Sequence, residues 1–201
     1  PGDQYILRVE APECARHAIP GSFAHIRCDA DIPMRRPLSI MRANAATGEV
    51  DFLYKIVGPG LRALSHARNG DSLSILGPIG NGFSSNSQRP HKLMVGGGVG
   101  IPPMVFFAEH LQRSGAPLDN SLVLMGSEVP FPFALLSSKI TVRGLPEEAT
   151  HSMQELENLG VASRLASEQD YAGCYRGYVT ALAAAWLKSL SADTLAKVEM
   201  F

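Results

Sequence analysis

The sequence has little of several features that mark whole classes of proteins. Its 18 basic and 19 acidic side chains give a formal charge of −1, so it lacks the basic surface that nucleic-acid binding requires. No apolar run approaches the roughly 18 residues that a membrane-spanning helix needs, and no charged and then apolar leader opens the chain. We therefore expect no nucleic-acid partner and no membrane association.

Cysteine is scarce as well. Cys14, Cys28 and Cys174 are an odd and widely spaced set, which fits neither a disulfide framework nor a metal-binding spacing. A reducing cytoplasm is therefore the expected location. The chain opens on Pro1 without a methionine and closes on residues 198–201, which read as a strand cut at its tip. We expect the sequence to be part of a longer protein.

The most informative stretch that is present lies in the middle of the chain. Residues 93–95 read as a short buried strand, and apolar residues from Ile101 to Leu111 recur at helical spacing. The four glycines between them are Gly96, Gly97, Gly98 and Gly100. A strand, a glycine loop and a helix N-terminus together present backbone N–H groups to a phosphate. The spacing matches neither G-x-G-x-x-G nor a Walker loop, so an ordinary strand-to-helix turn stays equally open.

Hydrophobic patterning divides the chain into two parts. The first part is rich in alternating segments and predicts strands over 5–9, 23–28, 52–57 and 73–76, with a short helix over 61–68. After a polar linker over 84–90, the pattern predicts strands over 121–126, 140–142, 161–165 and 198–201, and helices over 151–159 and 180–190. We expect an antiparallel β-barrel domain over 1–88, followed by a parallel-sheet α/β domain over 89–201.

Three further motifs in the barrel part carry candidate chemistry. Arg36-Pro37-Leu38-Ser39 follows a predicted strand and offers a guanidinium fork for a diphosphate and a hydroxyl for a ring nitrogen. Val57-Gly58-Pro59-Gly60 runs from the strongest predicted strand into a glycine turn, where backbone N–H groups could contact a diphosphate. Residues 70–83 include Gly80 and Gly82, and they suit either a close-lying planar ligand or an elaborate barrel corner. A surface arginine and plain turns are the structural alternatives for the first two.

The order of these motifs resembles the ferredoxin-NADP reductase superfamily. The matching pieces are Arg-Pro-x-Ser at 36–39, Gly-x-Gly at 58–60, Gly-Asp-x-Leu-x-x-x-Gly-Pro-x-Gly-x-Gly-Phe at 70–83 and Gly-Gly-Gly-x-Gly-x-Pro-Pro at 96–103. Within the superfamily, the chain most resembles the electron-transfer subunit of dihydroorotate dehydrogenase, including Gly177-Tyr178-Val179-Thr180 before the late helix. The resemblance spans nearly the whole sequence.

The resemblance implies FAD on the barrel and NAD(H) on the parallel-sheet domain. It also implies a [2Fe–2S] cluster, held by four cysteines that would lie beyond the end of this sequence. Glu128 follows the second strand of the nucleotide domain, where a carboxylate could accept ribose hydroxyls, although a solvated loop glutamate is the alternative. The residues expected to contact the cofactors are Arg36, Pro37, Leu38, Ser39, Val57, Gly58, Gly60, Gly80, Gly82, Gly96, Gly97, Gly98, Val99, Gly100, Pro102 and Glu128.

The function that the resemblance implies is that of a flavoprotein electron-transfer subunit. It would pass electrons between a nicotinamide cofactor and a catalytic dihydroorotate dehydrogenase subunit or another redox protein, as part of a hetero-oligomer in pyrimidine biosynthesis. No side chain needs to act as an acid or base, so we expect no catalytic residue. Leu38 and Leu61 depart from the aromatic and the threonine usual in the superfamily. A stand-alone flavin, ferredoxin or oxygenase reductase and a flavin-less regulatory protein therefore remain alternatives.

Overall fold

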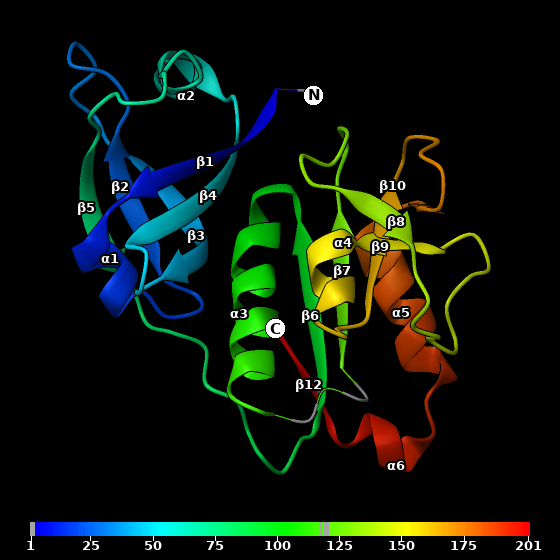
Figure 1. Ribbon diagram of the computed structural model, residues 1–201. Helices are drawn as coiled ribbons and strands as arrows, with labels where there is room; N and C mark the ends of the chain where they lie inside the picture. The colour runs from blue at the N-terminus through cyan, green and yellow to red at the C-terminus, as the bar shows by residue number, and fades with distance from the viewer. Residues whose placement is uncertain (1–2, 117, 119–120) are drawn as a thin grey trace.

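The structure, a computed structural model, describes residues 3–116, 118 and 121–201, and these residues form two five-stranded sheets and one two-stranded sheet (Figure 1). The first half contains β1 (Gln4–Glu10), α1 (Pro12–His17), β2 (Phe23–Arg27), β3 (Arg36–Asn44), β4 (Glu49–Lys55), α2 (Gly58–Leu64) and β5 (Ser74–Ile79). The second half begins with β6 (His91–Gly97), the 3-10 turn η1 (Gly98–Gly100), α3 (Ile101–Arg113), β7 (Leu122–Gly126) and β8 (Leu135–Ser137). It ends with β9 (His151–Met153), α4 (Gln154–Asn158), β10 (Ser163–Ser167), β11 (Tyr175–Arg176), α5 (Val179–Ser189), α6 (Ala192–Leu195) and β12 (Val198–Met200).

The first sheet is antiparallel and curls into a barrel with the strand order β1-β4-β3-β2-β5. Alternate residues of β2, such as Ala24 and Ile26, point into its core because successive side chains of a strand face opposite sides. Within the described residues, β1 and β5 are the two edges of this sheet, so the barrel is open along one seam. This half confirms the predicted antiparallel barrel.

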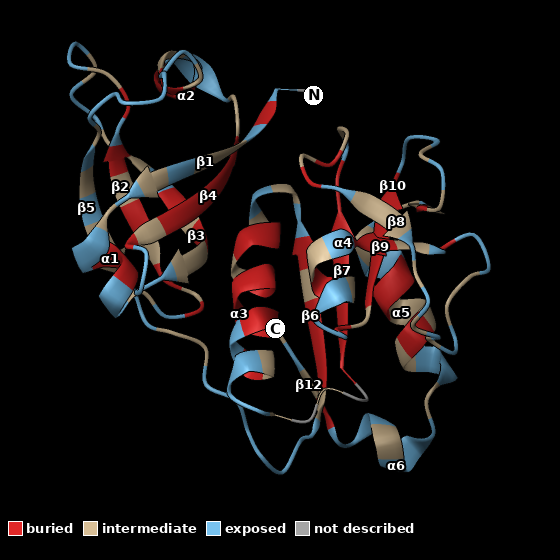
Figure 2. Ribbon diagram, viewed as in Figure 1, coloured by how far each residue is buried: buried red, intermediate tan, exposed pale blue. Residues whose placement is uncertain are grey.

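The second sheet is parallel, with the strand order β11-β10-β7-β6-β12, and helices cover both of its faces. Met94 and Val123 pack with α3 and α4 on one face, whereas Leu93 and Leu122 pack with α5 on the other. Figure 2 shows that the central strands β6 and β7 are mostly buried, as strands covered on both faces must be. The predicted parallel sheet with helices on both faces is confirmed.

Helix α3 belongs to the cores of both sheets. Nine of its 13 residues are buried, more than a helix that covers only one sheet needs to bury. Phe106 joins the barrel core, while Met41 and Leu53 from the barrel join the cluster that α3 forms with the parallel sheet. Arg42 Nε donates to Glu109 Oε1 at 2.6 Å across the same interface. The two halves are therefore packed together.

The segment between the sheets has no helix or strand over 81–90, as predicted for the linker, yet it is firmly attached. Lys92 Nζ donates to the carbonyl oxygens of Asn86 and Arg89 at 2.8 and 2.6 Å, and to Glu199 Oε2 at 2.5 Å. Because Lys92 and Glu199 are register partners in β6 and β12, one buried lysine fastens the linker to the parallel sheet.

Some expected elements differ from the structure. Residues 140–142 are a loop rather than a strand, because Glu157 accepts hydrogen bonds from the N–H groups of Lys139 and Ile140 at 2.6 and 3.3 Å. Ser138 and Ser152 donate their hydroxyls to the same carboxylate at 2.8 and 2.9 Å. The loop is thereby held by a side chain and not by a neighbouring strand.

Three boundaries also differ. Residues 151–153 form β9, which pairs with β8, and only Gln154 begins the helix expected from His151 onward. Arg36 opens β3 itself instead of following a strand, and α2 begins at Gly58 rather than at Leu61. β9 exists through its pairing with β8, whereas β3 and α2 begin at proline and glycine residues that locally indicate a turn.

Candidate functional site: a cleft between the barrel and the parallel sheet

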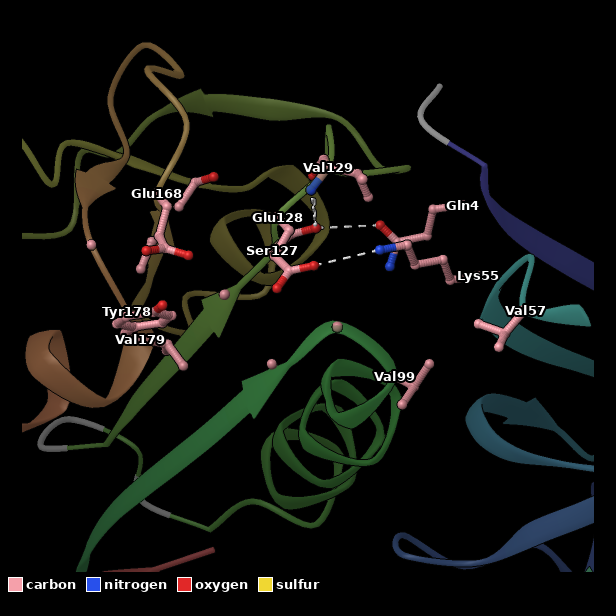
Figure 3. Close-up of a pocket in the computed structure, with 16 residues that line it drawn as sticks. Gln4, Lys55, Val57, Val99, Ser127, Glu128, Val129, Glu168, Tyr178 and Val179 are labelled. Carbon is pink, nitrogen blue, oxygen red and sulfur yellow. Dashed lines mark hydrogen bonds and ion pairs between the residues drawn. The ribbon is translucent and has the colours of Figure 1, made fainter.

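A cleft of about 380 Å³ lies where the barrel meets the carboxyl edge of the parallel sheet (Figure 3). The carboxyl edge is where ligands bind in open α/β sheets. The barrel contributes the residues that begin β1 and follow β4, which are Gln4, Lys55 and Val57. The parallel-sheet half contributes Gly97, Gly98, Val99, Gly126, Ser127, Glu128, Val129, Ala166, Ser167, Glu168, Gly177, Tyr178 and Val179.

The glycine segment predicted as a loop forms the end of β6 and the turn η1, and its four glycines have different roles at the cleft wall. A Cβ at Gly96 would lie 2.5 Å from the carbonyl oxygen of Gly100, so this position supports the tight turn. Gly98 has a φ of +52°, and a Cβ there would meet nothing within 4 Å. Gly100 is equally open. Gly96 therefore shapes the loop from inside, whereas Gly98 and Gly100 leave room for a ligand.

The start of α3 is a weaker phosphate site than the sequence indicates. Pro102 and Pro103 have no backbone N–H, and the N–H of Ile101 donates to the carbonyl oxygen of Gly98. Three of the first donors of the helix are thus missing or occupied. Any anion held at this loop has to be bound mainly by the backbone N–H groups of the glycines.

Charged groups cross the cleft and line its far end. Lys55 Nζ from the barrel lies 3.5 Å from Glu128 Oε2, which follows β7 (Figure 3). Glu168 follows the neighbouring strand β10, and its hydrogen bond with the phenol of Tyr178 raises the pKa of Tyr178. The two carboxylates therefore stand at adjacent strand ends, where they can accept hydroxyl donors and repel a phosphate.

Three large apolar side chains are exposed at the cleft. Val57 is 68% exposed, Val99 61% and Tyr178 63%, although such residues are usually inside a protein. Figure 3 places Val57 and Val99 near the barrel and Tyr178 at the opposite end. Exposed apolar surfaces beside a few polar groups are typical of a site for a planar ligand.

A second group of predicted residues meets on the barrel. A Cβ at Gly60 would lie 3.1 Å from Arg36 Nε, so the guanidinium rests directly over the start of α2. The contacts of Arg36 are long, at 3.4 Å to the Met34 carbonyl oxygen and 3.5 Å to that of Arg35. Gly58 has a φ of +75° and open space where a Cβ would be. This cradle of weakly bonded guanidinium N–H groups and glycine backbone fits a diphosphate group.

The remaining predicted site residues of the barrel lie where other side chains already fill most of the space around them. Leu38 is 6% exposed within the barrel core, and Ser39 is half-buried on the opposite side of β3. A Cβ at Gly80 would meet the ring of Phe23 at 3.2 Å, and one at Gly82 would meet Ile19 at 2.6 Å. The two glycines thus let the 77–83 segment pack on the turn before β2. Pro37 is exposed beside Leu38. A ligand contact at any of these positions stays a prediction.

The part of the chain that the structure describes contains no group of three or more metal-binding side chains, and its three cysteines are buried and unpaired. The longest helix there, α3, has 13 residues, and no helix in that part has the length and hydrophobicity of a membrane span.

The structure thus brings some predicted residues together and adds others. Val57, Gly97, Gly98, Val99 and Glu128 all line the cleft, whereas Arg36, Gly58 and Gly60 form the cradle on the barrel. The other residues that line the cleft were not among the predicted site residues, and those with polar side chains include Gln4, Lys55, Glu168 and Tyr178. Glu168 carries the same signal as Glu128, a carboxylate after a buried strand, whereas Gln4 carries no local signal at all.

Known proteins share both sequence and architecture with this chain. It is 43% identical over 118 residues to the dihydroorotate dehydrogenase B (NAD(+)) electron transfer subunit of Bacillus velezensis, a match covering 56% of this chain and 46% of that one. It is 36% identical over 109 residues to the same subunit of Desulforamulus reducens, covering 53% and 42%. The predicted similarity to these subunits is confirmed, and the match spans about half the length of each relative.

Solved structures of low sequence identity show the same architecture. An NADH-dependent reduced ferredoxin-NADP oxidoreductase superposes with a TM-score of 0.69 and 24% identity, over 94% of this chain and 60% of that one. The ferredoxin reductase of carbazole 1,9a-dioxygenase gives 0.68 and 18% identity, over 98% and 55%. The chain has the ferredoxin reductase fold. The cytochrome b5 reductase domain of Ulva prolifera nitrate reductase superposes with a TM-score of 0.61 and 16% identity. This match covers 99% of the present chain and 91% of that domain. No model of a known protein family matches the chain.

Proposed function

We propose that this chain holds FAD on the barrel and a nicotinamide dinucleotide on the parallel sheet, so that hydride passes between the two in the cleft. The observation that carries the proposal is the cleft itself, because residues from both halves line it and exposed apolar side chains flank it. We place the division between the two binding domains at residues 88 and 89, inside the linker. The cofactors supply the redox chemistry, and the protein supplies binding and orientation.

The barrel residues provide the FAD site in this proposal. Arg36 would pair with the diphosphate, and the backbone of Gly58 and Gly60 would approach it closely. The hydroxyl of Ser39 would contact the ring system. Two observations support this assignment: the hydrogen bonds of the Arg36 guanidinium are long, and the glycine backbone beside it is open.

The parallel sheet would hold NADH rather than NADPH. Backbone N–H groups of Gly97 and Gly98, which line the cleft, and of Gly100, which is open, would contact the dinucleotide, and Glu128 would accept its ribose hydroxyls. Glu168 adds a second carboxylate at the next strand end. Lys55 offsets one of the two carboxylates, and the remaining net negative charge would repel the extra phosphate of NADPH, which supports a preference for NADH.

The electron acceptor in this proposal is a partner protein. The relatives are named as electron transfer subunits of dihydroorotate dehydrogenase B, which supports a hetero-oligomer with a catalytic dihydroorotate dehydrogenase subunit. The scarcity of cysteine supports a place in the cytoplasm. The [2Fe–2S] cluster of this proposal would be held by cysteines outside the present sequence, because Cys14, Cys28 and Cys174 lie in separate, buried places.

An absorption spectrum of the full-length protein, recorded before and after anaerobic addition of NADH, tests the proposal. Flavin bands that bleach above iron–sulfur absorbance would support the electron-transfer subunit. Bleaching without cluster absorbance would favour the stand-alone reductase. A colourless protein that takes up no added FAD would contradict the enzyme and leave the flavin-less regulatory protein.

A further inference from the structure

Gln4 is a polar side chain in an unusual place. It is the first residue of β1, it is only 2% exposed, and it lines the cleft close to Lys55, its partner in the β1–β4 register. Glutamine is mostly found on protein surfaces, and a buried amide is normally saturated with hydrogen bonds. The hydrogen-bond partners of each Gln4 amide atom therefore decide whether the side chain is satisfied within the protein.

The amide of Gln4 has weak partners. Its Oε1 lies 3.5 Å from Ser127 Oγ, at the outer limit of a hydrogen bond. The hydroxyl of Ser127 is already occupied, because it lies 2.7 Å from the carbonyl oxygen of Val129 and accepts from the Val129 N–H at 3.3 Å. A hydroxyl has a single proton, so it cannot donate to both Val129 and Gln4.

The nitrogen of the amide has fewer partners still. Among residues 3–116, 118 and 121–201, no group accepts a hydrogen bond from the Gln4 side-chain nitrogen. One donor and one acceptor, fixed in a common plane, thus remain available at the wall of the cleft. Figure 3 shows this amide opposite Ser127, on the same side of the cleft as the exposed side chains of Val57 and Val99.

This arrangement suits one kind of ligand group. Val57 and Val99 present apolar surface to the face of a planar ring, and the Gln4 amide can pair with a donor and acceptor at the edge of that ring. A primary carboxamide and a ring lactam both carry that pair of atoms. The nicotinamide and the pyrimidine edge of the flavin are the two sources of such an edge in the proposed function.

We propose that Gln4 is a ring-binding residue of the cleft, whose side-chain amide pairs with the amide edge of a redox ring and fixes its orientation. The inference rests on the proposed function and adds to it a residue from the barrel side. A purely structural bridge between Gln4 and Ser127 explains the position less well, since the 3.5 Å separation leaves both amide atoms without a good partner.

The test compares ligands with and without the nicotinamide ring. Dissociation constants of NAD⁺ and ADP-ribose are measured by calorimetry for the full-length, FAD-loaded protein and for Gln4→Met, which keeps the side-chain length but removes the amide. The affinity for FAD is measured in parallel. Gln88→Met, on the exposed linker, is the matched control. Gln4→Glu, which keeps an acceptor and loses the donor, is a second variant in case the first folds poorly.

A loss of about tenfold in NAD⁺ affinity, with ADP-ribose changed less than twofold, supports pairing with the nicotinamide, since one or two hydrogen bonds are removed. A similar loss in FAD affinity, with NAD⁺ unchanged, supports pairing with the flavin. Equal losses for NAD⁺ and ADP-ribose, or no change in any ligand, overturn the inference. If the wild-type protein binds neither FAD nor NAD⁺, the proposed function fails and the inference fails with it.

Discussion

At the scale of single residues, the glycine loop separates two tasks that the sequence cannot distinguish. Gly96 is enclosed, because a Cβ would lie 2.5 Å from the carbonyl oxygen of Gly100, whereas Gly100 itself has an ordinary φ of −84° and open space around it. The sequence predicts that this loop forms a strand-to-helix turn. Which glycine is needed for the turn and which is free for a ligand depends on the folded geometry.

We predict that Gly96→Ala destabilises the protein by about 1–3 kcal/mol, because the new methyl group overlaps the backbone of the turn. Gly100→Ala should change the free energy of unfolding by less than about 0.5 kcal/mol, as surface substitutions usually do, yet weaken NAD⁺ binding. Urea unfolding and calorimetric titration of the two variants measure these effects. Equal stability of both variants would contradict the distinction.

A second residue-scale prediction concerns Glu157. Burial raises the pKa of its carboxyl, but the hydrogen bonds from Lys139, Ser138, Ser152 and Ile140 outweigh burial, so its net pKa lies below the ordinary value. The folded pKa is thus lower than the unfolded one. The carboxylate therefore stabilises the fold above pH 4.5, the ordinary value, and this stabilisation disappears as the pH falls through the folded pKa.

We expect Glu157→Gln to lose about 1 kcal/mol at pH 7, a value at the low end for charged hydrogen bonds because the site is partly exposed. The difference from wild type should shrink as the pH falls below 4.5. Thermal unfolding from pH 7 to pH 3 measures it. Glu147→Gln, on an exposed part of the same chain segment, is the control and should follow the wild type. A pH-independent difference would show that charge is not involved.

At the scale of elements, α3 combines features that the sequence predicts with a buried face that the sequence does not predict. Its apolar spacing and its end near Gly115 are local signals, and both are confirmed, as Gly115 has a φ of +74°. Its second buried face is not predictable from the same pattern. Glu109 and Phe106 lie on that face, and their partners in β3 and the barrel core are far away in the sequence.

Removing only one partner of the Arg42–Glu109 ion pair on this face should destabilise the protein strongly. Glu109 is 7% exposed, and burial raises its pKa even though Arg42 opposes the shift. We predict that Glu109→Ala costs about 3 kcal/mol, because it leaves the Arg42 charge without a partner in the interface. The double variant Arg42→Met with Glu109→Leu should recover most of that loss. Guanidinium unfolding of the three proteins checks the prediction, and a double variant as unstable as Glu109→Ala would contradict it.

Elements formed by distant partners were the hardest to predict. Strands with a clear apolar run, such as 122–126, are confirmed close to their expected bounds. Strand β3 was missed because its arginines and Pro37 hide the alternation, and β8 and β9 are only three residues each and exist through their pairing with one another. Likewise, the cleft residue Gln4 is recognisable only once β1 and β7 meet.

At the scale of the whole molecule, the shared core predicts cooperative unfolding. Phe106 reaches from α3 into the barrel, whereas Leu182 on α5 packs on the opposite face of the parallel sheet. Replacing either by alanine should cost about 2–5 kcal/mol. Only Phe106→Ala should divide the single calorimetric transition into two, because it weakens the contact between the halves.

The loss of stability and the division of the unfolding transition can be separated in one experiment. Scanning calorimetry of Phe106→Ala and Leu182→Ala, at matched loss of stability, shows whether the number of transitions depends on which face of the sheet is damaged. A single transition for Phe106→Ala would mean that the other contacts, such as the Arg42–Glu109 pair, are sufficient to couple the halves.

The double membership of α3 also has a practical consequence for building hybrid reductases. A crossover in the linker would join the barrel of one protein to the α3 of another, and the side chains that meet Met41 and Phe106 would no longer have been selected together. Exchanging the 101–113 helix along with the barrel moves the mismatch to the other face instead. A working hybrid therefore has to carry a composite α3, with one face taken from each parent.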